Sequence, residues 1–431
     1  MKDKAIDWCR ENRDRLFEMT REMVLAYSPM DTGGEPACQK IVEKYLKLSG
    51  AIIKYEEINQ DKISASEDYV DVESMGLPLY DGRPNLVGAY GANPEDFQHD
   101  TPLPGSLIIN GHVDVVQMGE GWIVGQGQRI EGKLYGRGAA DMKAGLACAL
   151  FAMMAVRQTG VKLRMPVLIE SVVDEEGGGN GTLDLRLKGY RAGKAIIPEP
   201  TSLQGVCIAG RGAHFFEVSV IDENAGVIHY KKEGQNLLTA IGAIVNAVDE
   251  LSAQRCSKAN HPLWEAYDLV GMPKAPASIC QVIAGDWPSS MPCSAKLRGT
   301  IEYLPGEHLE EVKAELEKAV RDACLQNPFL KDCKYSLRWY GLKFPPSIIN
   351  AESSWAKEVR DTAALTILGN ANEPFPLIVG NGGSDLRLFH RFGIPAVLYG
   401  PGGDNTHGPN EFVNEEEMIL YTDFLLNLLL D

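Results

Sequence analysis

The sequence has no Cys-x-x-Cys pair, although it contains nine cysteines among its 431 residues. An odd number of cysteines without close pairs is not the pattern of a disulfide-stabilised secreted domain. It also argues against a structural zinc knuckle, which is built on closely paired cysteines. Reduced thiols fit a cytoplasmic protein best.

Long apolar runs and positive charge are also scarce. The longest apolar stretch, 145–156, is shorter than the roughly 20 residues that span a bilayer, so we interpret it as a buried helix. Residues 1–8 are charged and lack the apolar core of a secretory signal. The 42 basic and 59 acidic residues give a formal net charge of −17, which argues against nucleic acid or an anionic membrane as the main partner. We expect a cytoplasmic location and no membrane-spanning segment.

The length predicts two domains, and the first is an α/β domain. From residue 107 onward, strands are predicted at 107–110, 166–173 and 194–197, with helices at 142–158 and 182–187 between them. This alternation is typical of βαβ units and predicts a mainly parallel sheet with helices on both faces. Nearer the amino terminus, apolar stripes predict helices at 4–26 and 36–48. The stretch 61–104 is rich in Gly, Pro and Asp, and we interpret it as an insertion or long surface loop around a strand at 85–90.

A second domain is predicted after residue 209. Strands at 214–220, 278–283, 295–303 and 334–340 and helices at 236–251 and 310–324 follow one another in βαββαβ order, as in an α/β sandwich. The first pattern then returns, with strands at 377–379 and 396–399 and a closing helix at 415–430. The fold class is therefore α/β, with residues 210–343 inserted between the two parts of the first domain, 1–209 and 344–431.

Side chains of the kind that bind metal ions follow the strands of the first domain. Gly111-His112-Val113-Asp114 closes a predicted strand, and Asp141 follows a glycine-rich turn. The remaining candidates are Asp174-Glu175-Glu176, Pro198-Glu199-Pro200 and Thr406-His407-Gly408. Each alone has an ordinary explanation, such as a hydrogen-bonded pair or a solvated loop. Together, at the edge where strands of one sheet end, they supply the imidazole and carboxylate ligands of a catalytic zinc pair.

The motifs that carry these residues resemble a known family. They are Gly-His-Val-Asp-Val-Val, Leu-Tyr-Gly-Arg-Gly-Ala-Ala-Asp-Met-Lys-Ala-Gly, Asp-Glu-Glu-Gly-Gly-Gly, Pro-Glu-Pro-Thr and Tyr-Gly-Pro-Gly-Gly-Asp-Asn-Thr-His-Gly-Pro-Asn-Glu. The chain is similar to the zinc-dependent aminoacylase and carboxypeptidase family that includes acetylornithine deacetylase and succinyl-diaminopimelate desuccinylase. The resemblance runs in order along nearly the whole chain. It implies a zinc-peptidase catalytic domain and an inserted domain that serves as lid and dimerisation domain.

The resemblance assigns metal ligands residue by residue. His112, Asp141 and Glu199 are implied to hold one zinc, and Asp141, Glu176 and His407 the other. Asp141 would bridge the two ions, and the family's peptide bond after this residue is cis. Cobalt or manganese could replace zinc in such carboxylate and histidine sites. We expect Asp114 to accept a hydrogen bond from the His112 imidazole and to fix its tautomer.

Two further residues have predicted catalytic roles. Glu175, beside the ligand Glu176, is the expected general base; the alternative is a solvated loop acid without a role. His229 lies before a Gly-x-Asn sequence, and the resemblance implies that it donates to the substrate carbonyl oxygen, in relatives often across a dimer. A structural histidine at a strand end is the competing interpretation.

One departure from the family concerns the substrate carboxylate. Many relatives carry an Arg in a strand of the small domain to bind it, and our alignment places Glu302 there, which cannot bind a carboxylate unless it is protonated. Arg387, in Asp385-Leu386-Arg387, resembles an aminoacylase Asp-x-Arg and is the expected replacement. The alternative is a surface arginine on the following helix.

The sequence thus predicts a di-zinc amidohydrolase, acetylornithine deacetylase-like, that cleaves the amide of an N-acyl amino acid or a related small molecule. A dipeptidase or carboxypeptidase of the same family is the closest alternative. A non-catalytic binding protein on the same fold is a third possibility, although no ligand position has been lost. We expect a homodimer that forms through the inserted domain.

Overall fold

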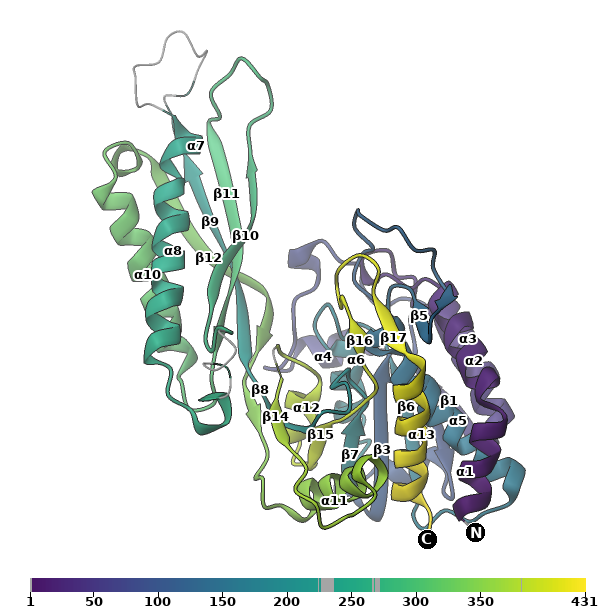
Figure 1. Cartoon of the computed structure of the whole chain (residues 1–431). Helices are drawn as coiled ribbons and strands as arrows, with labels where there is room; N and C mark the ends of the chain where they lie inside the picture. Colours follow the sequence, from purple (N-terminus) through teal and green to yellow (C-terminus); the bar gives the residue numbers. More distant parts are fainter. Residues whose placement is uncertain (1, 224, 226–235, 266, 268–271, 381) are drawn as a thin grey trace. The chain divides into compact units, whose positions relative to one another are not determined.

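The computed structural model describes residues 2–223, 225, 236–265, 267, 272–380 and 382–431. The chain forms two compact units (Figure 1). Unit 1 comprises Met1–Ala209, Ile348–Gly380 and Ser384–Asp431, and unit 2 comprises Gly210–Ser347 with Asn381–Gly383. All of the predicted metal ligands belong to unit 1.

Unit 1 is built on a sheet of nine strands, in the order β1-β2-β6-β3-β7-β15-β8-β13, with β14 paired to β8. The strands are β1 (Ile52–Glu56), β2 (Asn85–Tyr90), β3 (Leu103–His112), β6 (Val167–Val172), β7 (Ala192–Ile197), β8 (Val206–Gly210), β13 (Ser347–Ile348), β14 (Leu377–Val379) and β15 (Ala396–Leu398). The sheet is mixed. Its central strands β6, β3, β7 and β15 are parallel, whereas β1 and β2 are antiparallel to their neighbours.

The predicted α/β class is confirmed, and the antiparallel edge refines the expected mainly parallel sheet. The connection from β1 to β2 contains the short helix α4 (Gln60–Ser64) and one 3-10 turn (Glu73–Met75), but no long helix. A parallel pair requires a crossover of a dozen or more residues that usually contains a helix lying on the sheet, whereas an antiparallel pair does not. The absence of helical periodicity between residues 65 and 84 was the sequence signal for this orientation.

Helices cover both faces of this sheet, as residue alternation along β3 shows. Asn110 donates to Thr182 of α6 (Asn180–Leu187), whereas a Cβ on Gly111 would point to Leu146 of α5 (Ala144–Thr159). Because neighbouring residues of a strand point to opposite faces, α5 and α6 cover opposite sides. The other helices are α1 (Lys2–Glu11), α2 (Arg13–Leu25), α3 (Glu35–Ser49), α11 (Ser354–Leu368), α12 (Leu386–Arg391) and α13 (Glu415–Leu429).

Two sequence expectations about these elements change, and the buried helix expected at 145–156 is confirmed. The predicted helix at 4–26 is two helices, α1 and α2, separated at Asn12, whose side-chain amide donates to the carbonyl of Trp8. The stretch 61–104 is not a surface loop, because it buries Val70, Val72, Tyr80 and Phe97. Residues Ala139–Thr159 are long and apolar enough to cross a membrane by length and composition, but 89% of the most apolar window is buried inside the protein, as in a core helix.

A small antiparallel sheet, absent from the sequence prediction, joins two distant segments of unit 1. Its order is β16-β17-β5-β4, with β4 (Arg129–Ile130), β5 (Lys133–Tyr135), β16 (Gly403–Asp404) and β17 (Phe412–Asn414). Strand β5 leads into the glycine-rich turn before Asp141. Strands β16 and β17 flank the loop of His407. The sheet therefore brings two predicted ligands together from positions more than 260 residues apart.

Unit 2 has the predicted βαββαβ order. Its sheet, in the order β10-β11-β9-β12, consists of β9 (Gly212–Ile221), β10 (Ala277–Ala284), β11 (Ser294–Tyr303) and β12 (Lys334–Phe344). Alternate residues of β9, Phe216, Val218 and Val220, are buried in one core with side chains of α8 (Gly242–Lys258) and α10 (Leu309–Gln326). The short helix α7 (Leu237–Ala240) precedes α8.

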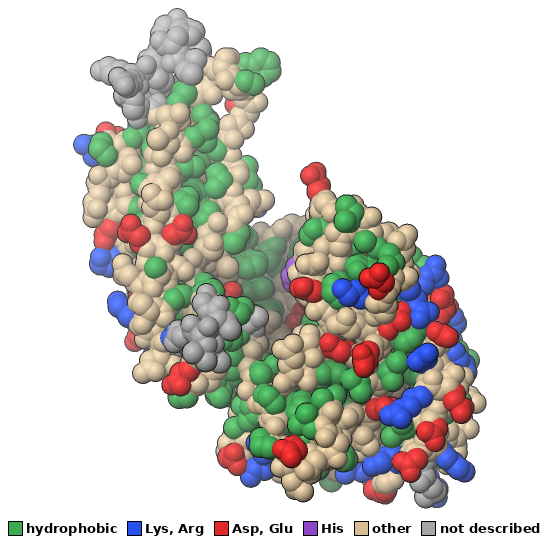
Figure 2. All heavy atoms as spheres, viewed as in Figure 1, with side chains coloured by type: hydrophobic (Ala, Val, Ile, Leu, Met, Phe, Trp, Pro, Cys, Tyr) green, Lys and Arg blue, Asp and Glu red, His purple; other side chains and the backbone are tan. Residues whose placement is uncertain are grey.

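The surface of unit 1 carries charges of both signs. Over the part that contains α1 and α2, Lys and Arg side chains are interspersed with Asp and Glu (Figure 2). The net charge of −17 is therefore not gathered into one patch on the face shown.

One glycine of α5 sets how closely this helix approaches a ligand loop. A Cβ on Gly145 would lie 2.3 Å from the carbonyl oxygen of Pro198, the residue before Glu199. We predict that Gly145→Ala destabilises the protein by about 1–3 kcal/mol, the usual cost of overpacking. Gly193→Ala, where the nearest atom would lie 3.5 Å away, is the matched control. Equal thermal unfolding midpoints for the two variants would contradict the packing described here.

Candidate metal centre

The five predicted ligands converge at one edge of the central sheet. His112 ends β3, Glu176 follows β6, and Glu199 follows β7, so all three lie at the carboxyl ends of parallel strands. Asp141 lies in the turn Ala139–Lys143 before α5, where its own backbone is not helical, and His407 lies between β16 and β17. Loops at this edge of an α/β sheet commonly form ligand sites.

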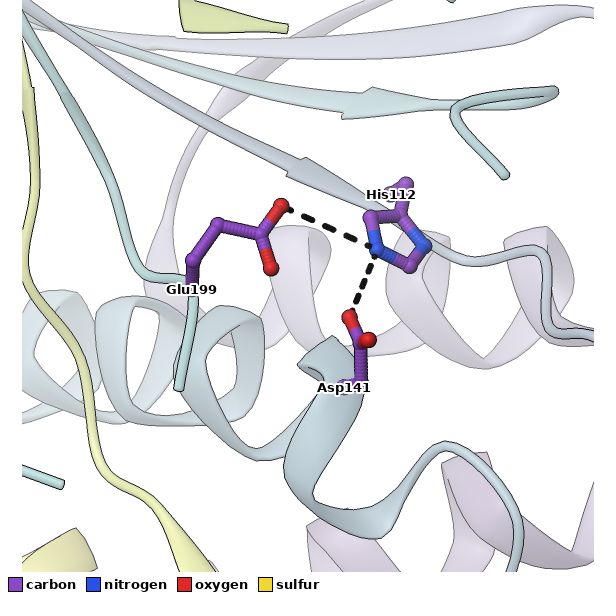
Figure 3. A group of neighbouring side chains, drawn as sticks. All are labelled: His112, Asp141 and Glu199. Carbon is purple, nitrogen blue, oxygen red and sulfur yellow. Dashed lines mark hydrogen bonds and ion pairs between the residues drawn. The ribbon is translucent and has the colours of Figure 1, made fainter. Parts of the chain in front are cut away.

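The first cluster contains His112, Asp141 and Glu199. Nε2 of His112 lies 3.1 Å from Oδ1 of Asp141 and 4.0 Å from Oε1 of Glu199, so the imidazole faces both carboxylates (Figure 3). The three ligand atoms all lie within 4.8 Å of one another. All three side chains are at least 86% buried, because 1%, 14% and 13% of their surfaces are exposed.

The second cluster shares Asp141 with the first. Nε2 of His407 lies 3.2 Å from Oδ2 of Asp141 and 3.0 Å from Oε2 of Glu176. The two oxygens of Asp141 thus face different imidazoles, which is the arrangement of a bridging carboxylate. The peptide bond between Asp141 and Met142 is cis, as the resemblance implied. His407 is half exposed, with 50% of its side chain accessible to solvent.

The clusters concentrate negative charge that needs a cationic partner. Burial raises the pKa of Glu199 well above its usual value, and the nearby charge of Asp141 raises it further. Hydrogen bonds to Asp141 and Glu176 raise the pKa of His407 to about 10. Burial alone would raise the pKa of Asp141, but hydrogen bonds from His112 and His407 lower it. The protonated imidazoles thus supply positive charge beside the carboxylates. Bound metal ions would take over this role, and their binding would release the imidazole protons.

Glu175 belongs to neither cluster but lies beside the first. Its Oε2 is 3.9 Å from Nε2 of His112, and 11% of its side chain is exposed. Burial raises the pKa of Glu175 well above its usual value; His112 opposes the shift, and the charges of Glu199 and Asp385 add to it. A carboxylate that is close to the ligands, but not among them, is placed to exchange a proton with a substrate or water there.

Asp114 acts on a different partner from the one expected. Nδ1 of His112 lies 3.0 Å from the backbone carbonyl oxygen of Asp114 and 3.7 Å from its carboxylate. The carboxylate instead accepts hydrogen bonds from the backbone N–H groups of Glu175, at 3.2 Å, and Glu176, at 3.0 Å. The imidazole N–H is satisfied by the carbonyl, so the carboxylate is available to fix the loop that carries the expected base and one ligand.

Tyr80 is a neighbour that the sequence did not indicate. Its hydroxyl donates to Asp174 at 2.5 Å and accepts from the side-chain amide of Asn180 at 2.7 Å. Burial raises the pKa of Asp174 to about 8. The stretch around Tyr80 therefore packs against the loop that holds Glu175 and Glu176. The apolar side chains of Val70, Val72 and Tyr80, all buried in the structure, were the sequence signal for this packing, because a solvated loop does not need them.

The residues predicted to contact substrate have different outcomes. Arg387 is 3% exposed, and its Nη2 donates to the carbonyl oxygen of Gly178 at 2.7 Å, in the loop that follows Glu176. It is therefore not a surface arginine; its binding of a substrate carboxylate stays a prediction. In unit 2, Glu302 pairs with Arg211, with Oε2 and Nε 3.0 Å apart. His229 lies outside the described residues.

Two other charged residues lie between the ligand loops. Arg137 and Glu411 form a buried pair 2.6 Å apart, and neither had an assigned role in the sequence prediction. Both stand in the motifs that carry Asp141 and His407. Arg137 stands between two glycines, and Glu411 follows Gly-Pro-Asn. A charged side chain among such small and turn-forming residues was the sequence signal for a role in the site.

Comparison with known proteins identifies the family. The model of Peptidase family M20/M25/M40 matches residues 108–431. The chain belongs to this family. It is a metal-dependent hydrolase that acts on amide bonds.

Curated relatives include deacylases. An N-formyl-4-amino-5-aminomethyl-2-methylpyrimidine deformylase of Bacillus subtilis is 27% identical over 386 residues, covering 82% of this chain and 84% of the relative. A succinyl-diaminopimelate desuccinylase of Methylobacterium radiotolerans is 25% identical over 349 residues, covering 78% of this chain and 81% of the relative.

Solved structures share the whole fold. Human carnosine dipeptidase 1 matches with a TM-score of 0.75 at 17% identity, covering 99% of this chain and 98% of that one. A dinuclear metal binding peptidase of the M20 family from Bacillus subtilis matches with a TM-score of 0.60 at 15% identity, covering 97% of this chain and 98% of that one. At these identities the likeness shows the fold.

A substitution at Glu175 should distinguish its role from that of the metal ligands. We expect Glu175→Gln to keep two bound metal ions but to lower kcat by roughly 10²-fold or more, because a positioned general base commonly contributes that much. Elemental analysis and steady-state kinetics on the same sample measure both quantities. A variant that loses an ion, with activity in proportion to the remaining metal, would reverse the roles of Glu175 and Glu176.

Substitutions at Asp141 and His407 test whether Asp141 bridges the two ions. Asp141→Ala should remove both metal ions, because Asp141 is the residue shared by the two clusters. His407→Ala should chiefly weaken one ion, since its imidazole belongs to a single cluster. Metal counting after dialysis against metal-free buffer distinguishes them. Equal losses in the two variants would contradict the sharing of Asp141.

Proposed function

We propose that this protein is a two-metal deacylase that hydrolyses the amide bond of a small N-acyl compound. The observation that carries the proposal is the pair of clusters that share Asp141, with the buried carboxylate of Glu175 beside them. His112, Asp141 and Glu199 would hold one divalent ion, and Asp141, Glu176 and His407 the other. Zinc suits this mixed set of nitrogen and oxygen ligands, and cobalt or manganese would also be accepted.

The chain's own groups then divide the chemistry. When bound, the ions polarise the scissile carbonyl and acidify water. Glu175 accepts a proton from the attacking water and passes it to the nitrogen of the leaving amine, so that its carboxylate is restored after each cycle. Asp114 keeps the Glu175 backbone in place through the hydrogen bonds described above.

The substrate we favour has no α-carboxylate. At the position where relatives bind that group, Glu302 already pairs with Arg211. The predicted replacement, Arg387, is buried and donates to Gly178. The name of the Bacillus subtilis relative describes a formylated aminopyrimidine and includes no carboxylate. These three observations support a formamide or similar small amide with a neutral or cationic amine portion, rather than acetylornithine.

The deacylase proposal includes expectations about assembly. From the sequence we expect a cytoplasmic homodimer that forms through the inserted domain, with His229 acting in its own subunit or across the dimer. Sedimentation equilibrium of the purified protein measures the oligomeric state.

A substrate panel tests the proposed class. We expect a higher kcat/KM for neutral N-formyl amines than for N-formyl, N-acetyl or N-succinyl amino acids. Glu302, at one predicted carboxylate-binding position, pairs with Arg211, and Arg387, at the other, already donates to Gly178. Dipeptides are included in the same panel. A higher kcat/KM for dipeptides than for N-formyl amines would show that the protein is a peptidase and not a deacylase.

Arg387→Ala should lower kcat for acids and for their amides alike, because Arg387 donates to the carbonyl oxygen of Gly178, in the loop that follows Glu176. A rise in KM confined to substrates with a free carboxylate would instead show that Arg387 binds that group.

A further inference from the structure

A buried ion pair connects the loops of two metal ligands. Arg137 follows β5, Glu411 precedes β17, and their side chains are 1% and 0% exposed. Nη1 of Arg137 lies 2.6 Å from Oε2 of Glu411. A buried pair of this kind is costly to form unless its remaining donors and acceptors are also satisfied.

Glu411 satisfies its acceptors with the backbone of the Asp141 loop. Its Oε2 also accepts from the N–H of Gly138 at 3.1 Å, and its Oε1 accepts from Ala140 at 3.0 Å and Asp141 at 3.2 Å. One carboxylate therefore accepts from three backbone donors and one guanidinium. It fixes the chain direction from the glycine-rich turn into the bridging ligand.

Arg137 makes the reciprocal contact with the His407 loop. Its Nη2 donates to the carbonyl oxygen of Gly408, the residue after His407, at 3.1 Å. The guanidinium also lies over the ring of Trp122, 5.6 Å from the ring centroid. Each member of the pair thus comes from one loop and holds the backbone of the other.

The small sheet does not make this connection by itself. Its ladder between β17 and β5 runs from Phe412 paired with Tyr135 to Asn414 paired with Lys133. The segments that carry Asp141 and His407 lie beyond the end of that ladder. The ion pair and its backbone contacts continue the connection to within one residue of each ligand.

We propose that Arg137 and Glu411 are positioning residues that set the affinity of the metal ion held by Asp141, Glu176 and His407. The inference rests on the proposed two-metal site. Neither side chain is among the clustered ligand atoms, so the pair acts on the metal through the positions of Asp141 and His407. Outer contacts of this kind typically change metal affinity by 10- to 100-fold.

The test compares metal affinity in full-length variants. In Glu411→Gln the amide offers one acceptor oxygen in place of two, and its NH₂ group would face an N–H donor. Arg137→Met removes the contacts with Glu411 and Gly408 and keeps much of the side-chain volume. With Co²⁺ or Zn²⁺ titrated against a competing chelator, we expect one of two ions to bind roughly 10- to 100-fold more weakly in both variants. Arg137→Lys should restore part of the affinity.

A matched control separates positioning from general loss of a buried charge pair. Glu170 pairs with Arg186 in the same unit, both 0% exposed, and also accepts from Asn110. Glu170→Gln should lower thermal stability yet bind both ions with wild-type affinity. Excess metal should restore the activity of Arg137→Met.

Three results would overturn the inference. Wild-type affinity for both ions in Glu411→Gln and Arg137→Met would show that the pair does not set metal binding. Equal weakening in Glu170→Gln would show a general stability effect. Fewer than two ions in the wild-type protein would remove the two-metal site itself, and the proposed function would then fail before the variants are compared.

Discussion

The carboxylates of Asp141, Glu175, Glu176 and Glu199 lie together at one edge of a buried sheet, and their mutual repulsion must be offset for the protein to fold as described. Charges in such a buried place interact far more strongly than in water. Protons on His112 and His407 offset part of the repulsion, as the raised pKa of His407 shows. Two divalent ions between the same ligands would offset more, and this need for cations links the acidic cluster to metal-dependent hydrolysis.

The surrounding structure holds these repelling groups in place through the backbone. The carboxylate of Asp114 accepts hydrogen bonds from the backbone N–H groups of Glu175 and Glu176. The carboxylate of Glu411 accepts hydrogen bonds from the backbone N–H groups of Ala140 and Asp141. Arg387 donates to the carbonyl oxygen of Gly178, in the loop that carries Glu175 and Glu176. These hydrogen bonds hold the backbone from which the site carboxylates extend, and they do not use the oxygens of those carboxylates. The ligand oxygens therefore stay available for cations and substrate.

Much of this site was predictable because it depends on strand ends. His112 ends a strand with an apolar pattern, Glu176 and Glu199 each follow one, and parallel strands end at one edge of the sheet. His407 and Asp141 were indicated by motif resemblance, since their meeting depends on the small sheet of β4, β5, β16 and β17. Those strands are two or three residues long and have no periodic pattern to detect. The partners of Asp114 and Glu411 are backbone groups, whose positions depend on the folded loops, so the residue types alone did not reveal them.

The central claim is that two metal ions share Asp141, and anomalous diffraction from crystals of the zinc-loaded protein tests it most directly. Data collected at the zinc absorption edge should show two peaks about 3.5–4 Å apart, the usual spacing of two-metal hydrolytic sites. The carboxylate of Asp141 should lie between the two peaks, with His112 and Glu199 at one and Glu176 and His407 at the other. A single peak, or two peaks without Asp141 between them, would contradict the account.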